Sequence, residues 1–140
     1  MHWEQKVQHA EETDVGLRRK NNQDSFCVQV CSDQEIWEQF GHLFVVADGM
    51  GGHAVGELAS KIAVDTIPLA FYKSRATGLS EAVVEAIKNA NTAINERGTQ
   101  NVEFNRMGTT CVLLVLSSEG AVFGHVGDSR AYRVRGDRIE

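Results

Sequence analysis

The sequence predicts an α+β fold in which antiparallel β-sheets pack against helices. Two segments with the pattern of strands come first, two with the pattern of helices follow, and three more strand-like segments end the chain. Separate runs of strands and of helices are typical of this fold class. The 140 residues are enough for one domain.

The first two strands are expected at residues 25–30 and 42–47. In the first segment, Phe26, Val28 and Val30 alternate with smaller or polar residues, which is the pattern of a half-buried strand. The second segment, HLFVVA, is almost continuously apolar. Such a run predicts a strand that is covered on both faces.

Both helices are expected between the second strand and residue 98. Apolar residues recur at spacings of three and four from Val55 to Ile67, so they form one face of a helix. Pro68 is expected to kink or end that helix. The second helix is expected to begin near Ser80, which is a good N-cap, and to stop at Gly98.

The last three strands are predicted at residues 109–116, 121–126 and 130–135. Gly136 and Asp137 then have the residue types of a two-residue hairpin turn, yet only three residues follow them. The sequence therefore predicts a truncated domain, with a polar tail at 1–12 and the N-terminal part of a single domain at 13–140.

Composition and charge argue against several kinds of protein. The chain carries 19 acidic and 14 basic residues, for a net charge of -5, and a nucleic-acid partner would favour a basic surface. No apolar run approaches the length of a membrane span, and the polar N-terminus lacks the pattern of a signal or transit peptide. We therefore expect no nucleic-acid or membrane partner, a cytoplasmic location, and Cys27, Cys31 and Cys111 as reduced thiols.

Three acidic residues lie where predicted strands begin or end. Asp24 precedes the first strand, Asp48 follows the second, and Asp128 lies in the short gap before the last. A carboxylate at a strand end has a fixed backbone and can point into a cleft, which suits a hard cation such as Mg²⁺ or Mn²⁺. The glycines after Asp48 would let the carbonyl of Gly49 approach the same ion. An ordinary turn is the alternative for each Asp-Gly pair taken singly.

Two arginines and two histidines are further candidates for a site. Arg19 and Arg130 offer bidentate donors to phosphate oxygens, and either could instead pair with a nearby acid. His53 follows the glycine-rich turn and could reach a cleft, whereas His125 lies within a strand and is expected in the core. Neither histidine has a second histidine at metal-site spacing, so zinc is not expected.

Four segments of the chain form an ordered set, and they read DVGLRRKNNQDS, VVADGMGGHAVGELAS, GTTCVLLVL and GHVGDSRAYRVR. Together they resemble the bacterial form of the metal-dependent Ser/Thr protein phosphatases of the protein phosphatase 2C type, over roughly residues 13–140. The resemblance implies two antiparallel sheets packed as a β-sandwich between helices, a four-layer αββα arrangement. It also implies two Mn²⁺ or Mg²⁺ ions, with a third in several bacterial members, and a bridging water that attacks the phosphorus of phosphoserine or phosphothreonine.

The resemblance also implies roles for individual residues. Asp48 corresponds to the acid that bridges both ions, and Gly49 to the residue that supplies a backbone carbonyl to one of them. Asp24 corresponds to the acid that holds the water shell of the metals. Arg19 corresponds to the arginine that binds the substrate phosphate, and Asp128 to the acid used for a third ion.

The chain departs from the family pattern in three places. Gln23 stands where many relatives have Glu. Met50 stands where animal relatives have a histidine that is proposed as the general acid, so leaving-group protonation would fall to water or to another group. The motifs that supply further metal acids are expected beyond Glu140, and we therefore expect the chain alone to be weakly active or inactive.

The implied partners are proteins that a Ser/Thr kinase phosphorylates in signal transduction. Two alternatives stay open. One is a pseudo-phosphatase or phosphoprotein-binding fragment that keeps Arg19 and the cleft without turnover. The other is a structural fragment that pairs its exposed sheet edges with itself or another chain.

Overall fold

A computed structural model describes residues 6–104 and 106–140, and it has the predicted α+β composition. The elements, in chain order, are β1 (Asp24–Gln29), α1 (Gln34–Gln39), β2 (His42–Met50), α2 (His53–Tyr72), α3 (Leu79–Gln100), the 3₁₀ helix η2 (Val102–Phe104), β3 (Gly108–Thr109), β4 (Cys111–Ser117), β5 (Gly120–Val126), β6 (Val134–Arg135) and β7 (Arg138–Ile139). The strand pairs are antiparallel, as predicted.

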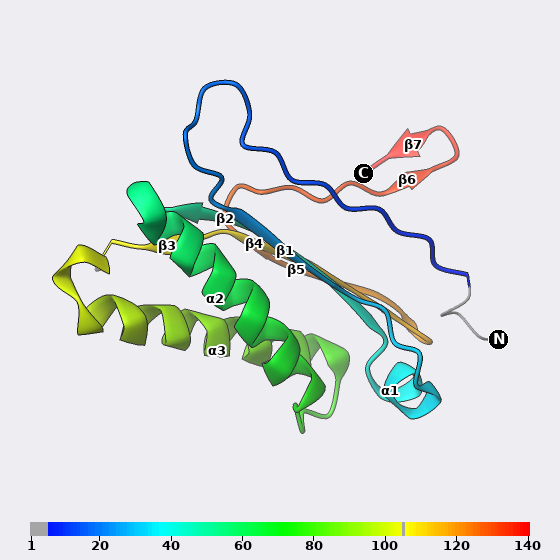
Figure 1. Cartoon of the computed structure of the whole chain (residues 1–140). Helices are drawn as coiled ribbons and strands as arrows, with labels where there is room; N and C mark the ends of the chain where they lie inside the picture. The colour runs from blue at the N-terminus through cyan, green and yellow to red at the C-terminus, as the bar shows by residue number, and fades with distance from the viewer. Residues whose placement is uncertain (1–5, 105) are drawn as a thin grey trace.

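One sheet forms the centre of the molecule. Its strands lie in the order β1-β2-β4-β5, and the short β3 pairs with the end of β2. Figure 1 shows α2 and α3 along one face of this sheet, with the N-terminal segment and the β6-β7 hairpin on the side of the other face. The described chain therefore has one helical layer packed on one sheet layer.

The hydrophobic core lies between the sheet and the two long helices. In β2, Leu43, Val45 and Ala47 are buried toward the helices, because successive side chains of a strand point to opposite faces. They form one cluster with Ile67 and Phe71 of α2. Burial of these apolar side chains holds the helical layer on the sheet.

The opposite face of the sheet is partly open, which corrects the prediction that the second strand is covered on both faces. Val46 is 52% exposed, and Phe123 of β5 is 50% exposed. The ring of His9 lies over Phe44, with ring centroids 6.3 Å apart. A cavity of about 570 Å³ lies between Phe123 and Tyr132 of the C-terminal segment. We call this side of β1, β2, β4 and β5 the open face.

The helix α2 is longer than predicted. It passes through Pro68 and ends at Tyr72, so the proline does not end it. Ile67 and Phe71 are buried on either side of the proline. Their packing holds the helix together although the proline removes one backbone hydrogen bond.

Both ends of α3 also differ from the prediction. Gly78 is the N-cap and makes no side-chain cap, so Ser80 lies within the first turn. At the other end, Gly98 is buried inside the helix, which continues to Gln100. Packing against neighbouring elements outweighs the weak helix propensity of glycine here.

The C-terminal segment forms less strand than predicted. The strand expected at residues 130–135 is reduced to β6, which pairs with β7. The backbone of Arg133 still pairs with Glu140, but residues 130–132 lie in no strand of the described chain. The turn predicted at Gly136 and Asp137 is confirmed by the pairing of β6 and β7. No helix in the described ranges is long and apolar enough to cross a bilayer.

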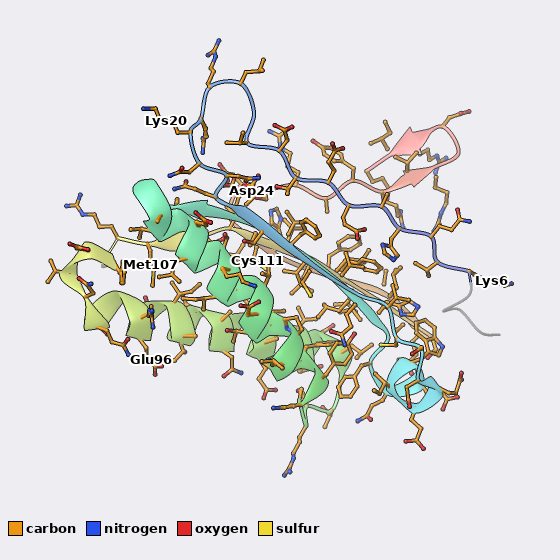
Figure 2. All side chains as sticks on the ribbon, in the orientation of Figure 1. Lys6, Lys20, Asp24, Glu96, Met107 and Cys111 are labelled. Atoms are coloured by element: carbon orange, nitrogen blue, oxygen red, sulfur yellow. The ribbon has the colours of Figure 1, made fainter. Side chains whose placement is uncertain are left out.

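Two smaller features complete the fold. The sequence did not predict α1, whose N-cap Asp33 accepts a hydrogen bond from the Ile36 amide at 3.1 Å. The three cysteines are free thiols, with Cys31 and Cys111 buried and Cys27 half-buried. Figure 2 shows Cys111 between the sheet and the helices.

Candidate metal centre

Two carboxylates come together across the first strand pair. Asp24 and Asp48 are direct partners in the register of β1 and β2, and the side chains of such partners are neighbours. Both lie on the open face with Phe26 and Val46, because side chains two residues apart in a strand share a face. Figure 2 shows Asp24 at the start of β1, where the loop that carries Lys20 joins the sheet.

Asp48 lies inside β2 rather than at its end, which corrects the prediction. The strand continues to Met50 because its last two residues pair with Thr109 and Gly108 of β3. The backbone of Asp48 is therefore held by pairing before and after it. This pairing fixes the backbone from which the Asp48 carboxylate extends on the open face.

The pKa of Asp24 is raised by partial burial and by its contact with Asp48. Partial burial raises the pKa above its ordinary value, the charge and hydrogen bonding of Asp48 raise it further, and Arg19 lowers it. A like charge beside a carboxyl opposes the ionisation of that carboxyl. A divalent cation would relieve that repulsion, and carboxylate oxygens are the ligands that Mg²⁺ and Mn²⁺ prefer.

The two carboxylates supply part of a metal site. Among residues 6–104 and 106–140, no group of three or more His, Cys, Asp or Glu side chains is placed to hold a metal ion. Asp128 is exposed in the turn after β5 and does not join Asp24 and Asp48 in such a group. Oxygen donors fit Mg²⁺ or Mn²⁺, which also take several waters, so the pair fits as one portion of a ligand set.

A buried hydroxyl from α2 holds the start of β1. Ser60 is fully buried, donates to the Gln23 carbonyl at 2.6 Å and bonds to the Ser25 hydroxyl at 2.9 Å. The same Gln23 carbonyl accepts the Gly49 amide at 3.0 Å. Asp24 is therefore fixed by α2 on one side and by β2 on the other.

Gly49 allows β2 and α2 to approach closely. A Cβ at position 49 would lie 1.8 Å from the carbonyl oxygen of Gly56. A Cβ at position 56 would lie 2.9 Å from the carbonyl carbon of Gly49. Both positions therefore require glycine for packing, apart from any role of the Gly49 carbonyl toward a metal.

Thr110 contacts the backbone of Asp48 twice, and the sequence analysis missed it. Its amide donates to the Asp48 carbonyl at 2.9 Å, and its hydroxyl accepts the Asp48 amide at 3.0 Å. The same hydroxyl bonds to the Ser129 hydroxyl at 2.5 Å. In the sequence, two threonines before an apolar strand are too common to indicate such a role.

The two arginines behave differently from each other. Arg19 is exposed in the loop before β1, and its charge lowers the pKa of Asp24. Arg130 donates to the Tyr132 hydroxyl at 3.2 Å. Within the described residues Arg130 therefore has a phenol as its partner rather than the acid considered from the sequence.

His125 does not join the carboxylate pair in the described structure. His125 is exposed, which corrects its predicted place in the core. The reason is that β5 is an edge strand and His125 lies on the open face. Its Nε2 donates to the Ser129 carbonyl at 2.5 Å. The side chain of His53 lies outside the described part of the chain.

Comparison with known proteins decides the family. A family model described as protein phosphatase 2C matches residues 18–139. The chain belongs to the protein phosphatase 2C family. The matched range includes Asp24, Asp48 and Asp128.

Members of the 2C family from bacteria resemble the chain over most of its length. A serine/threonine phosphatase of Listeria innocua is 33% identical over 134 residues, which are 92% of this chain and 51% of the relative. The chain thus spans about half the length of the curated relatives that it matches.

Solved structures of 2C phosphatases share the fold. The serine/threonine phosphatase PstP/Ppp of Mycobacterium tuberculosis has a TM-score of 0.75 at 30% identity, over 92% of this chain and 50% of that one. The catalytic domain of PstP in complex with 2 manganese ions has a TM-score of 0.74 at 30% identity, over 91% and 51%. The antiparallel sheet with its helices is therefore the fold of about half of a 2C domain.

Proposed function

We propose that this chain forms part of a metal-dependent phosphatase that hydrolyses phosphoserine and phosphothreonine esters in proteins. The observation that carries the proposal is the contact of Asp24 with Asp48 on the open face, in a chain of the 2C family. Two adjacent carboxylates with a fixed backbone repel each other when both are ionised, and a bound divalent cation would offset that repulsion.

Asp24, Asp48 and the carbonyl of Gly49 are the groups proposed to hold Mn²⁺ or Mg²⁺, and Asp128 is proposed for a third ion. The PstP structure with manganese supports this choice of metal. When bound, two such ions supply a Lewis acid and an activated water for attack on phosphorus. The chain's own residues fix the carboxylates through Ser60 and the pairing of β1 with β2.

Arg19 is proposed to bind the substrate phosphate. It is exposed in the loop before β1, and its charge reaches Asp24, so it lies near the carboxylate pair. A guanidinium can donate to two phosphate oxygens at once. Met50, at the end of β2, has no proton to donate, so protonation of the leaving group is assigned to water or to another group.

The proposed substrates are proteins phosphorylated by a Ser/Thr kinase, within the cytoplasm. The chain alone is proposed to be weakly active or inactive, because two carboxylates are few ligands for a dinuclear site. The half-length match to the curated relatives supports the same conclusion.

Hydrolysis of a phosphoserine peptide by the chain tests the proposal. With Mn²⁺ present we expect slow release of phosphate that stops on chelation and falls at least tenfold in Asp48→Asn, because that change removes a metal ligand. Asp65→Asn is the matched control, since Asp65 is an exposed acid on α2 paired with Lys61 at 2.8 Å, and it should keep the wild-type rate. Release that is independent of Mn²⁺, or equal in Asp48→Asn, would contradict the proposal.

The phosphoprotein-binding alternative predicts a different result. A non-catalytic module would bind the phosphopeptide through Arg19 and release no phosphate at any Mn²⁺ concentration. Phosphopeptide binding, measured by fluorescence anisotropy on the samples used for phosphate release, separates the two functions. In the binding alternative, Arg19→Ala weakens this binding and no sample releases phosphate.

A further inference from the structure

We infer that the hydroxyls of Thr110 and Ser129 form a link that positions Asp48 and the loop carrying Asp128 relative to each other. In this role both are positioning residues for the metal site. The effect on metal binding rests on the proposed function, whereas the link itself rests on the contacts of the described residues.

Thr110 holds both peptide groups of Asp48. Its amide donates to the Asp48 carbonyl at 2.9 Å, and its Oγ1 accepts the Asp48 amide at 3.0 Å. Thr110 is only 2% exposed, so water does not readily replace either bond. Side-chain hydroxyls that satisfy buried amides in this way stabilise one backbone position over others.

The same hydroxyl reaches the loop after β5. Thr110 Oγ1 lies 2.5 Å from Ser129 Oγ, and either hydroxyl can donate in this bond while Thr110 Oγ1 accepts the Asp48 amide. The Ser129 carbonyl accepts from His125 Nε2 at 2.5 Å. Ser129 is therefore held at both its side chain and its backbone.

A close packing contact supports the link independently of the hydrogen bonds. Gly127 has φ +94°, and a Cβ there would lie 2.8 Å from the Thr110 methyl carbon. The loop thus rests directly on Thr110. Asp128 lies between the residue that packs on Thr110 and the residue that bonds to it, so its backbone position depends on that threonine.

The link explains how two acids distant in sequence acquire a fixed relation. Asp48 belongs to β2 and Asp128 to the turn after β5, and β4 lies between these strands in the sheet. Thr110, directly before β4, contacts both the backbone of Asp48 and the loop that carries Asp128. Groups that hydrogen-bond to the residues of a metal site orient the metal ligands, and their loss typically lowers metal affinity by 10- to 100-fold.

Mn²⁺ titration of the 140-residue chain, followed by the electron paramagnetic resonance of the free ion, tests the positioning role. Thr110→Val and Ser129→Ala should each raise the Kd for Mn²⁺ by about tenfold, and Thr110→Ser should restore most of the affinity because it keeps the hydroxyl. Ser117→Ala is the control, since Ser117 is hydrogen-bonded in the β4-β5 turn at the far end of the strand. An unchanged Kd in both Thr110→Val and Ser129→Ala would overturn the positioning role.

A metal-free measurement keeps the link testable on its own. The NMR signal of the Asp48 amide should shift in Thr110→Val, and also in Ser129→Ala although residue 129 is 81 positions away. The amide should not move in Ser117→Ala. If the wild-type chain bound no Mn²⁺, the proposed function would be contradicted, but the NMR measurement would still test whether Thr110 and Ser129 form the link. An Asp48 amide unmoved by both changes would refute the link.

Discussion

Gly49 shows how one residue can serve both packing and a site. Its position next to Asp48 suggests a metal-facing carbonyl, and the structure adds a packing reason, because β2 and α2 leave no room for a Cβ between Gly49 and Gly56. The packing constraint and the metal-facing carbonyl can be tested by different experiments. A change at residue 49 affects stability before any metal is added.

Replacing Gly49 with alanine should destabilise the metal-free chain. The new Cβ would meet the Gly56 carbonyl oxygen at 1.8 Å, and backbone atoms cannot move aside as a flexible side chain can, so we expect a loss of about 3 kcal/mol in the free energy of unfolding. Gly108→Ala is the control, because its Cβ would lie 3.4 Å from the flexible Met50 side chain. Urea unfolding of the two variants gives the comparison, and equal stabilities would show that the close approach is absent in solution.

The site residues differ in how far sequence reveals them. Asp24 and Asp48 could be predicted, since an acid beside a strand and a glycine-rich turn form a visible pattern. Thr110 could not, because its role arises from the backbone of Asp48, 62 residues away in the chain. Ser129 and Ser60 are also common residue types whose partners become known only once the strands and α2 are in place.

At the scale of elements, β2 has two faces with different surroundings. The face toward α2 and α3 carries Val45, which is 1% exposed, and the open face carries Val46, which is 52% exposed. Both residues lie in the same strand and are chemically identical. The difference in exposure between Val45 and Val46 therefore shows that the helices cover one face of β2 and leave the other face partly open.

Val45→Ala and Val46→Ala should differ in their effect on stability. Removing two buried methyl groups at residue 45 should lower the free energy of unfolding by about 2 kcal/mol, because a cavity remains in the core. The same change at residue 46 should have an effect below about 1 kcal/mol, since water already contacts the side chain. Thermal or urea unfolding measures both, and equal losses would mean that the open face is covered in solution.

The order and type of the longer elements could be predicted, but their ends could not. Alternating and continuously apolar runs located β1, β2, β4 and β5, and helical spacing of apolar residues located α2 and α3. Local signals at Pro68 and Gly98 suggested helix ends, and packing of α2 and α3 against the sheet carried both helices further. The strand expected at 130–135 failed for the opposite reason, because strand formation needs a neighbouring strand as well as an alternating sequence.

At the scale of the whole molecule, the fold places the candidate metal ligands on the face that lacks a helical layer. Asp24 and Asp48 share the open face with Phe26 and Val46, and the cavity beside Phe123 lies on the same side. The chain corresponds to about half of PstP, with a TM-score of 0.75. The order of the predicted elements indicated the α+β class, and the family resemblance implied a four-layer αββα arrangement, of which the described chain shows one sheet layer and one helical layer.

The central claim is that Asp24 and Asp48 together bind a divalent cation. Calorimetric titration of the chain with Mn²⁺ tests it most directly, with Asp24→Asn, Asp48→Asn and the control Asp65→Asn measured alongside. We expect binding in the wild type and in Asp65→Asn, and a loss of about tenfold or more in affinity in each of the other two variants. Equal Mn²⁺ affinity in all four proteins, or no binding in any of them, would contradict it.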